Sequence, residues 1–97
     1  MQYISTRGDG TQYSYDEILL KGLSEDGGLF VPLNWPKFSN DQLLKMQDLD
    51  YAALASKIIS KFTTDVFNED EVFKVCQKVY KSFNHKDVAP LKKINEN

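Results

Sequence analysis

The fold is decided at residues 26–32, which read Asp26-Gly27-Gly28-Leu29-Phe30-Val31-Pro32. Paired glycines are typical of a tight loop, because glycine adopts backbone conformations that other residues avoid. The apolar run that follows has the residue types of a short buried strand, and Pro32 ends the run because proline lacks a backbone N–H. Residues near the start of the chain also have an extended pattern. We therefore expect two short strands, Gln2–Thr6 and Leu29–Val31, that pair with each other.

Helix-start signals surround and follow this stretch. In each case a residue type that caps a helix N-terminus precedes apolar residues at helical spacing. The predicted caps are Ser14, Ser39, Asp50 and Asn68. The first two predict short helices that end at Gly22 and near Met46. The last two predict longer amphipathic helices, and the apolar pattern of the second one stops at Phe83.

The two longer helices carry the predicted core. Its members recur at helical spacing and are Leu54, Ile58, Phe62, Val72, Cys76, Val79 and Tyr80. A chain of 97 residues is too short for a second core, so residues 1–97 are predicted to form a single domain. With a strand pair in the N-terminal third, the predicted class is a small α+β domain that is mostly helical.

Composition excludes several classes of protein. A net charge of −2 argues against a nucleic-acid-binding domain, which usually carries a large positive charge. The longest apolar runs are far short of the roughly 18 residues that a membrane helix needs, so no membrane association is expected. A single cysteine excludes an internal disulfide and favours a reducing compartment. We expect a cytoplasmic protein.

Residues that carry chemistry are scarce. His85 is the only histidine, in a polar turn, and Cys76 stands at core spacing, where a thiol is normally inert packing. The acidic run after Asn68 lacks the ligand spacing of a calcium loop and fits a helix N-terminus better. We therefore predict no catalytic, cofactor-binding or metal-binding residue in this chain.

One short motif has two interpretations. Ser5-Thr6-Arg7-Gly8 places hydroxyl groups, the only arginine of the chain and a flexible glycine in succession. Hydroxyls, backbone N–H groups and a guanidinium are the donors that a phosphate ester requires, which makes Thr6 and Arg7 candidate phosphate contacts. The alternative is the end of a surface strand whose arginine pairs with a carboxylate, Asp9 or Asp26.

The order and spacing of these motifs resemble the N-terminal domain of threonine synthase. The residues that carry the resemblance are Tyr3 to Gly8, the capped helix from Ser14 to Gly22, Asp26 to Pro32, and Trp35-Pro36-Lys37-Phe38-Ser39. The resemblance implies a fold-type II enzyme that uses pyridoxal phosphate to convert O-phospho-L-homoserine and water into L-threonine and phosphate.

The same resemblance implies that the reactive part lies elsewhere. In the family, the cofactor lysine belongs to a Phe-Lys-Asp motif, whereas here Phe73-Lys74 is followed by Val75. The glycine-rich cofactor-phosphate loop is also missing, and both features are expected after residue 97. Since the helical pattern stops at Phe83 without a closing element, we expect the chain to continue in a longer polypeptide.

The expected role is therefore that of a docking domain. It would pack on its own C-terminal catalytic domain and help to wall the substrate cleft, through a face around Gly27-Gly28, Phe30 and Trp35. Alone it is expected to be inactive. The alternative is a complete small helical adaptor that binds a partner peptide or helix in a groove.

Overall fold

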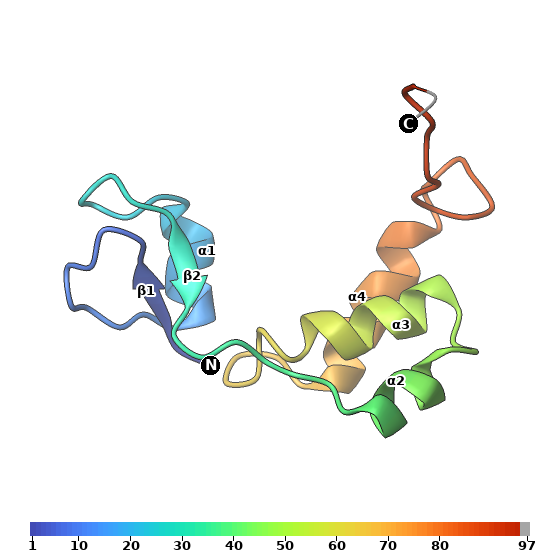
Figure 1. Ribbon diagram of the computed structural model, residues 1–97, viewed down its shortest axis with the longest axis horizontal. Helices are drawn as coiled ribbons and strands as arrows, with labels where there is room; N and C mark the ends of the chain where they lie inside the picture. Colours follow the sequence, from blue (N-terminus) through green and yellow to red (C-terminus); the bar gives the residue numbers. More distant parts are fainter. Residues whose placement is uncertain (96–97) are drawn as a thin grey trace.

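The computed structural model describes residues 1–95 and shows two lobes joined by a narrow connection (Figure 1). In chain order its elements are β1 (Tyr3–Ser5), α1 (Tyr15–Lys21), β2 (Phe30–Pro32), α2 (Asn40–Met46), α3 (Tyr51–Ile59) and α4 (Glu69–Tyr80). One lobe contains β1, β2 and α1, and the other contains α2, α3 and α4. The predicted small α+β domain, mostly helical with one strand pair in the first third, is confirmed.

The two strands pair antiparallel, with Ile4 opposite Val31 at the centre of the register. The second strand lies one residue later than expected, because Pro32 is its last residue and pairs with Tyr3. A third extended segment pairs with the other side of β1, where Tyr3 and Tyr13 exchange two backbone hydrogen bonds of 2.9 Å. These backbone contacts hold the start of the chain between β2 and the segment that precedes α1.

All four predicted helix caps are confirmed. The side chains of Ser39, Asp50 and Asn68 accept hydrogen bonds from backbone N–H groups in the first turn of their helices. At α1 the carboxylate of Glu17 accepts from the N–H of Ser14 at 3.2 Å. Gly22 ends this helix with φ of 75°, a conformation that residues with a side chain rarely adopt. Local chemistry thus fixes where each helix starts.

The buried core is smaller than predicted. Val72 and Cys76 are buried, whereas Leu54, Phe62 and Tyr80 are only half-buried. The prediction was wrong for Ile58 and Val79, whose exposed fractions are 41% and 46%. The most buried residues of the helical lobe are instead Ser56 and Thr63, each with 2% exposure.

The physical reason is that α3 is apolar on two sides. Ile59 lines a groove together with residues of α4. Ser56 is buried although it is polar, and its hydroxyl donates to the carbonyl of Ala53 at 2.7 Å. Leu54, Ala55 and Ile58 line a hollow on another side of α3. The helix also ends at Ile59, so Phe62 lies in the turn that follows. An apolar pattern on both sides does not determine which side is buried.

Aromatic contacts join the two lobes. The hydroxyl of Tyr3 donates to the backbone carbonyl of Phe62, which links β1 to the turn after α3. The ring of Tyr15 on α1 meets that of Phe67 edge-on, with centroids 6.4 Å apart. Trp35 meets Phe62 in the same manner at 6.3 Å. Edge-to-face pairs of this kind contribute roughly 0.5–1.5 kcal/mol each, so the connection has specific contacts.

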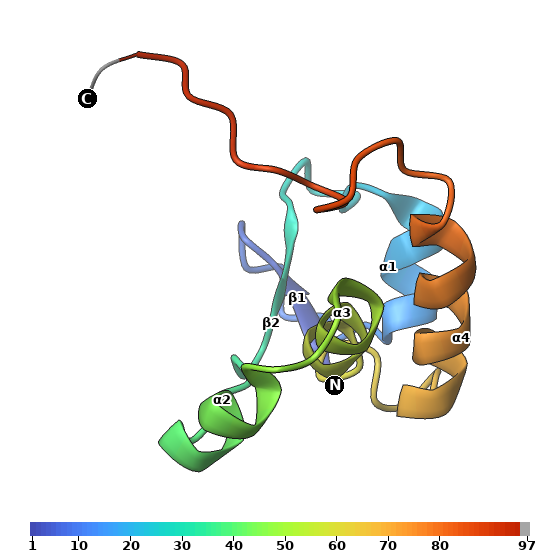
Figure 2. The same cartoon turned by 90° about the vertical axis from the view of Figure 1, so that its right-hand side faces the viewer.

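After α4 the chain runs away from the helical lobe (Figure 2). Within this segment Val88 has a φ of 62°. That value is uncommon for a β-branched residue. It occurs in a turn where the N–H of Val88 donates to the carbonyl of His85 at 2.9 Å. Beyond this turn, Leu91 and Ile94 are fully exposed.

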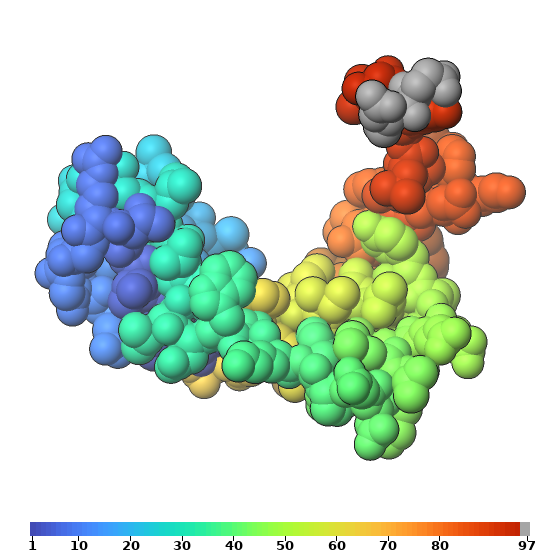
Figure 3. All heavy atoms as spheres, in the orientation of Figure 1, coloured from blue at the N-terminus to red at the C-terminus, as the bar shows by residue number. Residues whose placement is uncertain are grey.

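The molecule is open. Its radius of gyration is 16.1 Å, against about 12.5 Å for a compact chain of this length. Its accessible surface is 7683 Å², about 2,000 Å² more than a compact protein of this mass exposes. Figure 3 shows the notch between the two lobes that contributes to this excess. None of the helices in the described part of the chain has the length and apolar character that crossing a membrane requires.

Candidate functional site

The structure brings the two sequence motifs of the first third together. The hydroxyl of Ser5, at the end of β1, donates to Oδ1 of Asp26 at 2.7 Å. The same oxygen accepts from the N–H of Gly28 at 2.9 Å. The backbone N–H of Thr6 donates to the carbonyl of Leu29 at 2.8 Å, which continues the pairing of the strands into the loop. The result is a polar cluster, defined by Ser5, Thr6, Arg7, Asp26 and Gly28.

The two predicted phosphate contacts both hold the loop in this structure. Arg7 donates from Nη1 to the backbone carbonyl of Asp26 at 3.0 Å. Its partner is therefore a carbonyl rather than the carboxylate of Asp9 or Asp26. Oγ1 of Thr6 accepts from the N–H of Leu29 at 3.0 Å. Both side chains are exposed, and the guanidinium has further N–H groups that these contacts do not use.

The electrostatics of the polar cluster centre on Asp26. The hydrogen bond from Ser5 lowers the pKa of the Asp26 carboxyl below its ordinary value of 3.8, and the N–H of Gly28 acts in the same direction. Loss of solvent opposes this effect, while the nearby Ser24 hydroxyl and the charge of Arg7 add smaller contributions that also lower the pKa. The carboxyl is therefore ionised at neutral pH and is an acceptor of hydrogen bonds.

Gly28 is required by close approach. A Cβ atom at this position would lie 2.3 Å from Oγ of Ser5 and 3.0 Å from both Oδ1 of Asp26 and Oγ1 of Thr6. Gly27 is required by conformation, since its φ is 83°. The two glycines of the motif are thus required for different physical reasons. Together they allow the backbone to lie against the end of β1.

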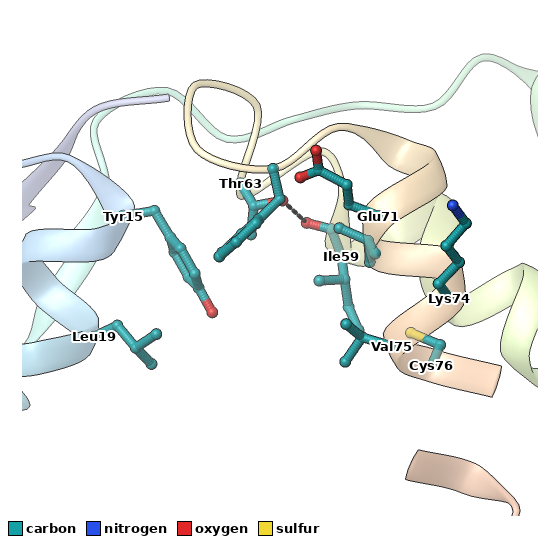
Figure 4. Close-up of a pocket in the computed structure, with 10 residues that line it drawn as sticks. Tyr15, Leu19, Ile59, Thr63, Glu71, Lys74, Val75 and Cys76 are labelled. Atoms are coloured by element: carbon teal, nitrogen blue, oxygen red, sulfur yellow. Dashed lines mark hydrogen bonds between the residues drawn. The ribbon is translucent and has the colours of Figure 1, made fainter. Parts of the chain in front are cut away.

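A second candidate site is an apolar groove between the lobes, which the sequence analysis did not predict. It has a volume of about 530 Å³. Figure 4 shows Tyr15 and Leu19 of α1 on one side, facing Ile59, Thr63 and Val75 on the other. The remaining lining residues are Phe67, Glu71, Val72, Lys74 and Cys76. The signal for it in the sequence is the apolar pair Leu19-Leu20 of α1. The structure leaves both of these side chains exposed rather than in a core.

The groove offers little polar chemistry. The hydroxyl of Thr63 is already directed at the carbonyl of Ile59, at 3.5 Å. Burial raises the pKa of the Cys76 thiol, which disfavours the nucleophilic thiolate. Lys74 is exposed on α4, and no group of three or more residues suited to bind a metal ion occurs within residues 1–95. Although Lys74 is one of the lining residues, this apolar lining does not fit pyridoxal phosphate, because it offers no cluster of donors for the phosphate.

Comparison with known proteins gives a consistent result. A family described as "Threonine synthase N terminus" matches residues 2–80. Threonine synthase of Pseudomonas aeruginosa is 36% identical over 97 residues, which are 100% of this chain and 21% of that protein. Threonine synthase of Methylobacillus glycogenes is 42% identical over 82 residues, covering 84% of this chain and 17% of that protein.

A solved structure agrees with these sequence matches. The crystal structure of PLP-bound threonine synthase from Brucella melitensis has 30% sequence identity and a TM-score of 0.86, covering 100% of this chain and 21% of that one. The chain thus spans about a fifth of the length of these relatives. Because the family match includes both strands and all four helices described above, this chain belongs to the family of threonine synthase N-terminal domains.

Proposed function

We propose that this chain is the non-catalytic N-terminal domain of a threonine synthase. The whole enzyme would convert O-phospho-L-homoserine and water into L-threonine and inorganic phosphate. The observation that carries the proposal is the family match over residues 2–80, supported by relatives named threonine synthase that are several times longer. The chemistry would belong to the part of the polypeptide that follows, in the cytoplasm.

The cofactor would be held outside this chain. The Brucella relative is described as bound to PLP. Here Lys74 is an exposed residue of α4, and Phe73-Lys74-Val75 departs from the family motif. We therefore assign pyridoxal phosphate to the catalytic domain and expect the 97-residue chain alone to be inactive.

Within the enzyme, the proposed role is docking on the catalytic domain and walling of its cleft. The excess accessible surface of about 2,000 Å² supports this role, because a stable interface buries about 800 Å² on each partner. On the expected face, Leu29 and Trp35 are exposed and Phe30 is half-buried against Tyr13, with ring centroids 5.0 Å apart. This face thus offers apolar area beside the polar cluster.

Thr6 and Arg7 have a second proposed role, contact with the phosphate of the substrate. Their exposure and the unused guanidinium N–H groups support it. The alternative function, a helical adaptor that binds a partner helix, has the apolar groove in its favour.

The proposed function is tested on the product of the gene that continues past residue 97. Purified with pyridoxal phosphate, it should release phosphate from O-phospho-L-homoserine and form L-threonine. The 97-residue chain, mixed with the cofactor, should give no saturable absorbance of a lysine adduct. Absence of phosphate release by the longer protein, or a stoichiometric adduct at one lysine of this chain, would contradict the proposal.

A further inference from the structure

The apolar groove carries exposed apolar side chains from both lobes. Leu19 of α1, Val75 of α4 and Phe67 line it, with exposed fractions of 61%, 61% and 41%. The hollow on α3 is a separate feature of about 270 Å³ that shares only Ile59 with the groove. An apolar surface of this extent normally marks an interaction site.

The lining indicates what kind of group this surface accepts. Small-molecule sites combine apolar walls with a few convergent polar groups, whereas here the Thr63 hydroxyl is directed at the carbonyl of Ile59 and both Glu71 and Lys74 are exposed. The walls come from helices and the turn between them, so they offer no free strand edge. An occupant must therefore satisfy its own backbone hydrogen bonds, as a helix does.

The open arrangement persists in a longer protein. The backbone of this chain, with its lobes apart, superposes at a TM-score of 0.86 on a threonine synthase chain of which it covers only 21%. The two lobes therefore keep the same arrangement in a protein that has several times more polypeptide, which could fill the space between them. Segments of the same polypeptide also have an advantage over separate partners, because tethering gives an effective concentration in the millimolar range.

We propose that the apolar groove, lined by Leu19, Ile59 and Val75, seats the apolar face of one helix of the catalytic domain that follows in the same polypeptide. This inference rests on the proposed function, since it requires that domain. The catalytic domain would then contact this domain inside the notch between the lobes, as well as on the face around Trp35.

The test is cysteine accessibility in the full-length protein. Leu19→Cys lies in the groove, and its neighbour Leu20→Cys does not line it. Their exposed fractions in this domain are 61% and 88%, so the two thiols should react with N-ethylmaleimide within about two-fold of each other if nothing filled the groove. With the helix in place, Leu19→Cys should react at least about ten-fold more slowly.

A second pair on α4 repeats the comparison. Val75→Cys lies in the groove, whereas Gln77→Cys is exposed two residues away and does not line it. Labelling is located by mass spectrometry, so other cysteines of the protein do not interfere. Equal rates within both pairs would overturn the proposal. Protection that disappears on dilution, together with a change from dimer to monomer mass, would overturn it by assigning the groove to a second copy.

Phosphate release measured on the same preparations separates this inference from the proposed function. Protected groove thiols in a protein that does not turn over O-phospho-L-homoserine would support the docked helix and contradict the enzymatic assignment. Unprotected groove thiols in an active enzyme would overturn the docked helix and leave the enzymatic assignment intact.

Discussion

The hydroxyl of Ser5 donates a hydrogen bond to Oδ1 of Asp26, 2.7 Å away, across 21 positions of the sequence. The two residues belong to different motifs, one at the end of β1 and the other in the loop before β2. Because the N–H of Gly28 donates to the same oxygen, this carboxylate holds the strand end and the glycine loop in one arrangement. A single acceptor atom therefore sets the geometry of the polar cluster.

This arrangement predicts acid sensitivity that depends on Asp26. The pKa of its carboxyl is lowered in the folded state, chiefly by the hydrogen bond from Ser5, so ionisation stabilises the fold above the ordinary value of 3.8. That stabilisation is lost as the pH falls below 3.8 through the lowered pKa. Asp26→Asn should flatten the dependence of the urea midpoint on pH in this range. The control is Asp48→Asn, at an exposed carboxylate, and an identical pH profile for Asp26→Asn and wild type would contradict the assignment.

Gly28→Ala should destabilise the domain through a steric contact. The new Cβ would lie 2.3 Å from Oγ of Ser5, and we expect a loss of about 1–3 kcal/mol in the free energy of unfolding. Ser5→Ala removes the atom in closest contact, so the double variant should lose less than the sum of the two single losses. Gly10→Ala is the contrast, because nothing lies within 4 Å of its Cβ and only its φ of 82° opposes the change. Additive losses in the double variant would show that the contact with Ser5 is not the cause.

Substitutions in the helical lobe should distinguish Val72 from Ile58. Val72→Asp places a charge at a buried position that offers it no partner, which costs several kcal/mol and should abolish the cooperative unfolding transition. Ile58→Asp should lower the free energy of unfolding by only about 1 kcal/mol, because the residue is 41% exposed and the carboxylate stays hydrated. Urea unfolding followed by circular dichroism measures both. A larger loss at Ile58 of α3 than at Val72 of α4 would contradict the exposure of Ile58 and the burial of Val72.

The helix starts could be predicted from the sequence because their causes are local. Asn68 accepts from the N–H of Glu71 only three residues away, so the pattern and the contact lie in the same short segment. The presence of two paired strands was also predictable, because Pro32 ends its strand for a local reason, the lack of a backbone N–H. The one-residue offset of β2 comes from pairing with Tyr3, which lies far away in the sequence.

The buried side of α3 could not be predicted, because Ile58 and Ile59 are equally apolar and adjacent. Ile59 lines the groove beside residues of α4 while Ile58 is 41% exposed, and this difference depends on how the two helices pack rather than on either helix alone. The partner of Arg7 was missed for a similar reason. The sequence pointed to a carboxylate, whereas the fold presents the backbone carbonyl of Asp26.

Cys76 should react slowly in the native protein. Its side chain is 5% exposed, and burial raises the pKa of the thiol, so less thiolate is present at neutral pH. We expect alkylation by iodoacetamide to be at least about a hundred-fold slower in buffer than in concentrated urea, because the native rate requires local opening of α4. Native and unfolded rates within about ten-fold of each other would contradict the burial of this thiol.

The role of Arg7 in substrate binding is tested by Arg7→Ala in the full-length enzyme. A direct contact with the phosphate predicts that KM for O-phospho-L-homoserine rises about ten-fold or more while kcat changes little, because a charged hydrogen bond to the bound substrate is lost. Arg7 also donates to the carbonyl of Asp26, so the substitution could act by loosening the loop. Ser5→Ala, which removes the hydrogen bond to Asp26 in the same loop and changes neither candidate phosphate contact, is the matched control for that effect. A raised KM in Arg7→Ala, with an unfolding midpoint like that of wild type, supports contact, whereas unchanged kinetics would leave Arg7 with a structural role alone.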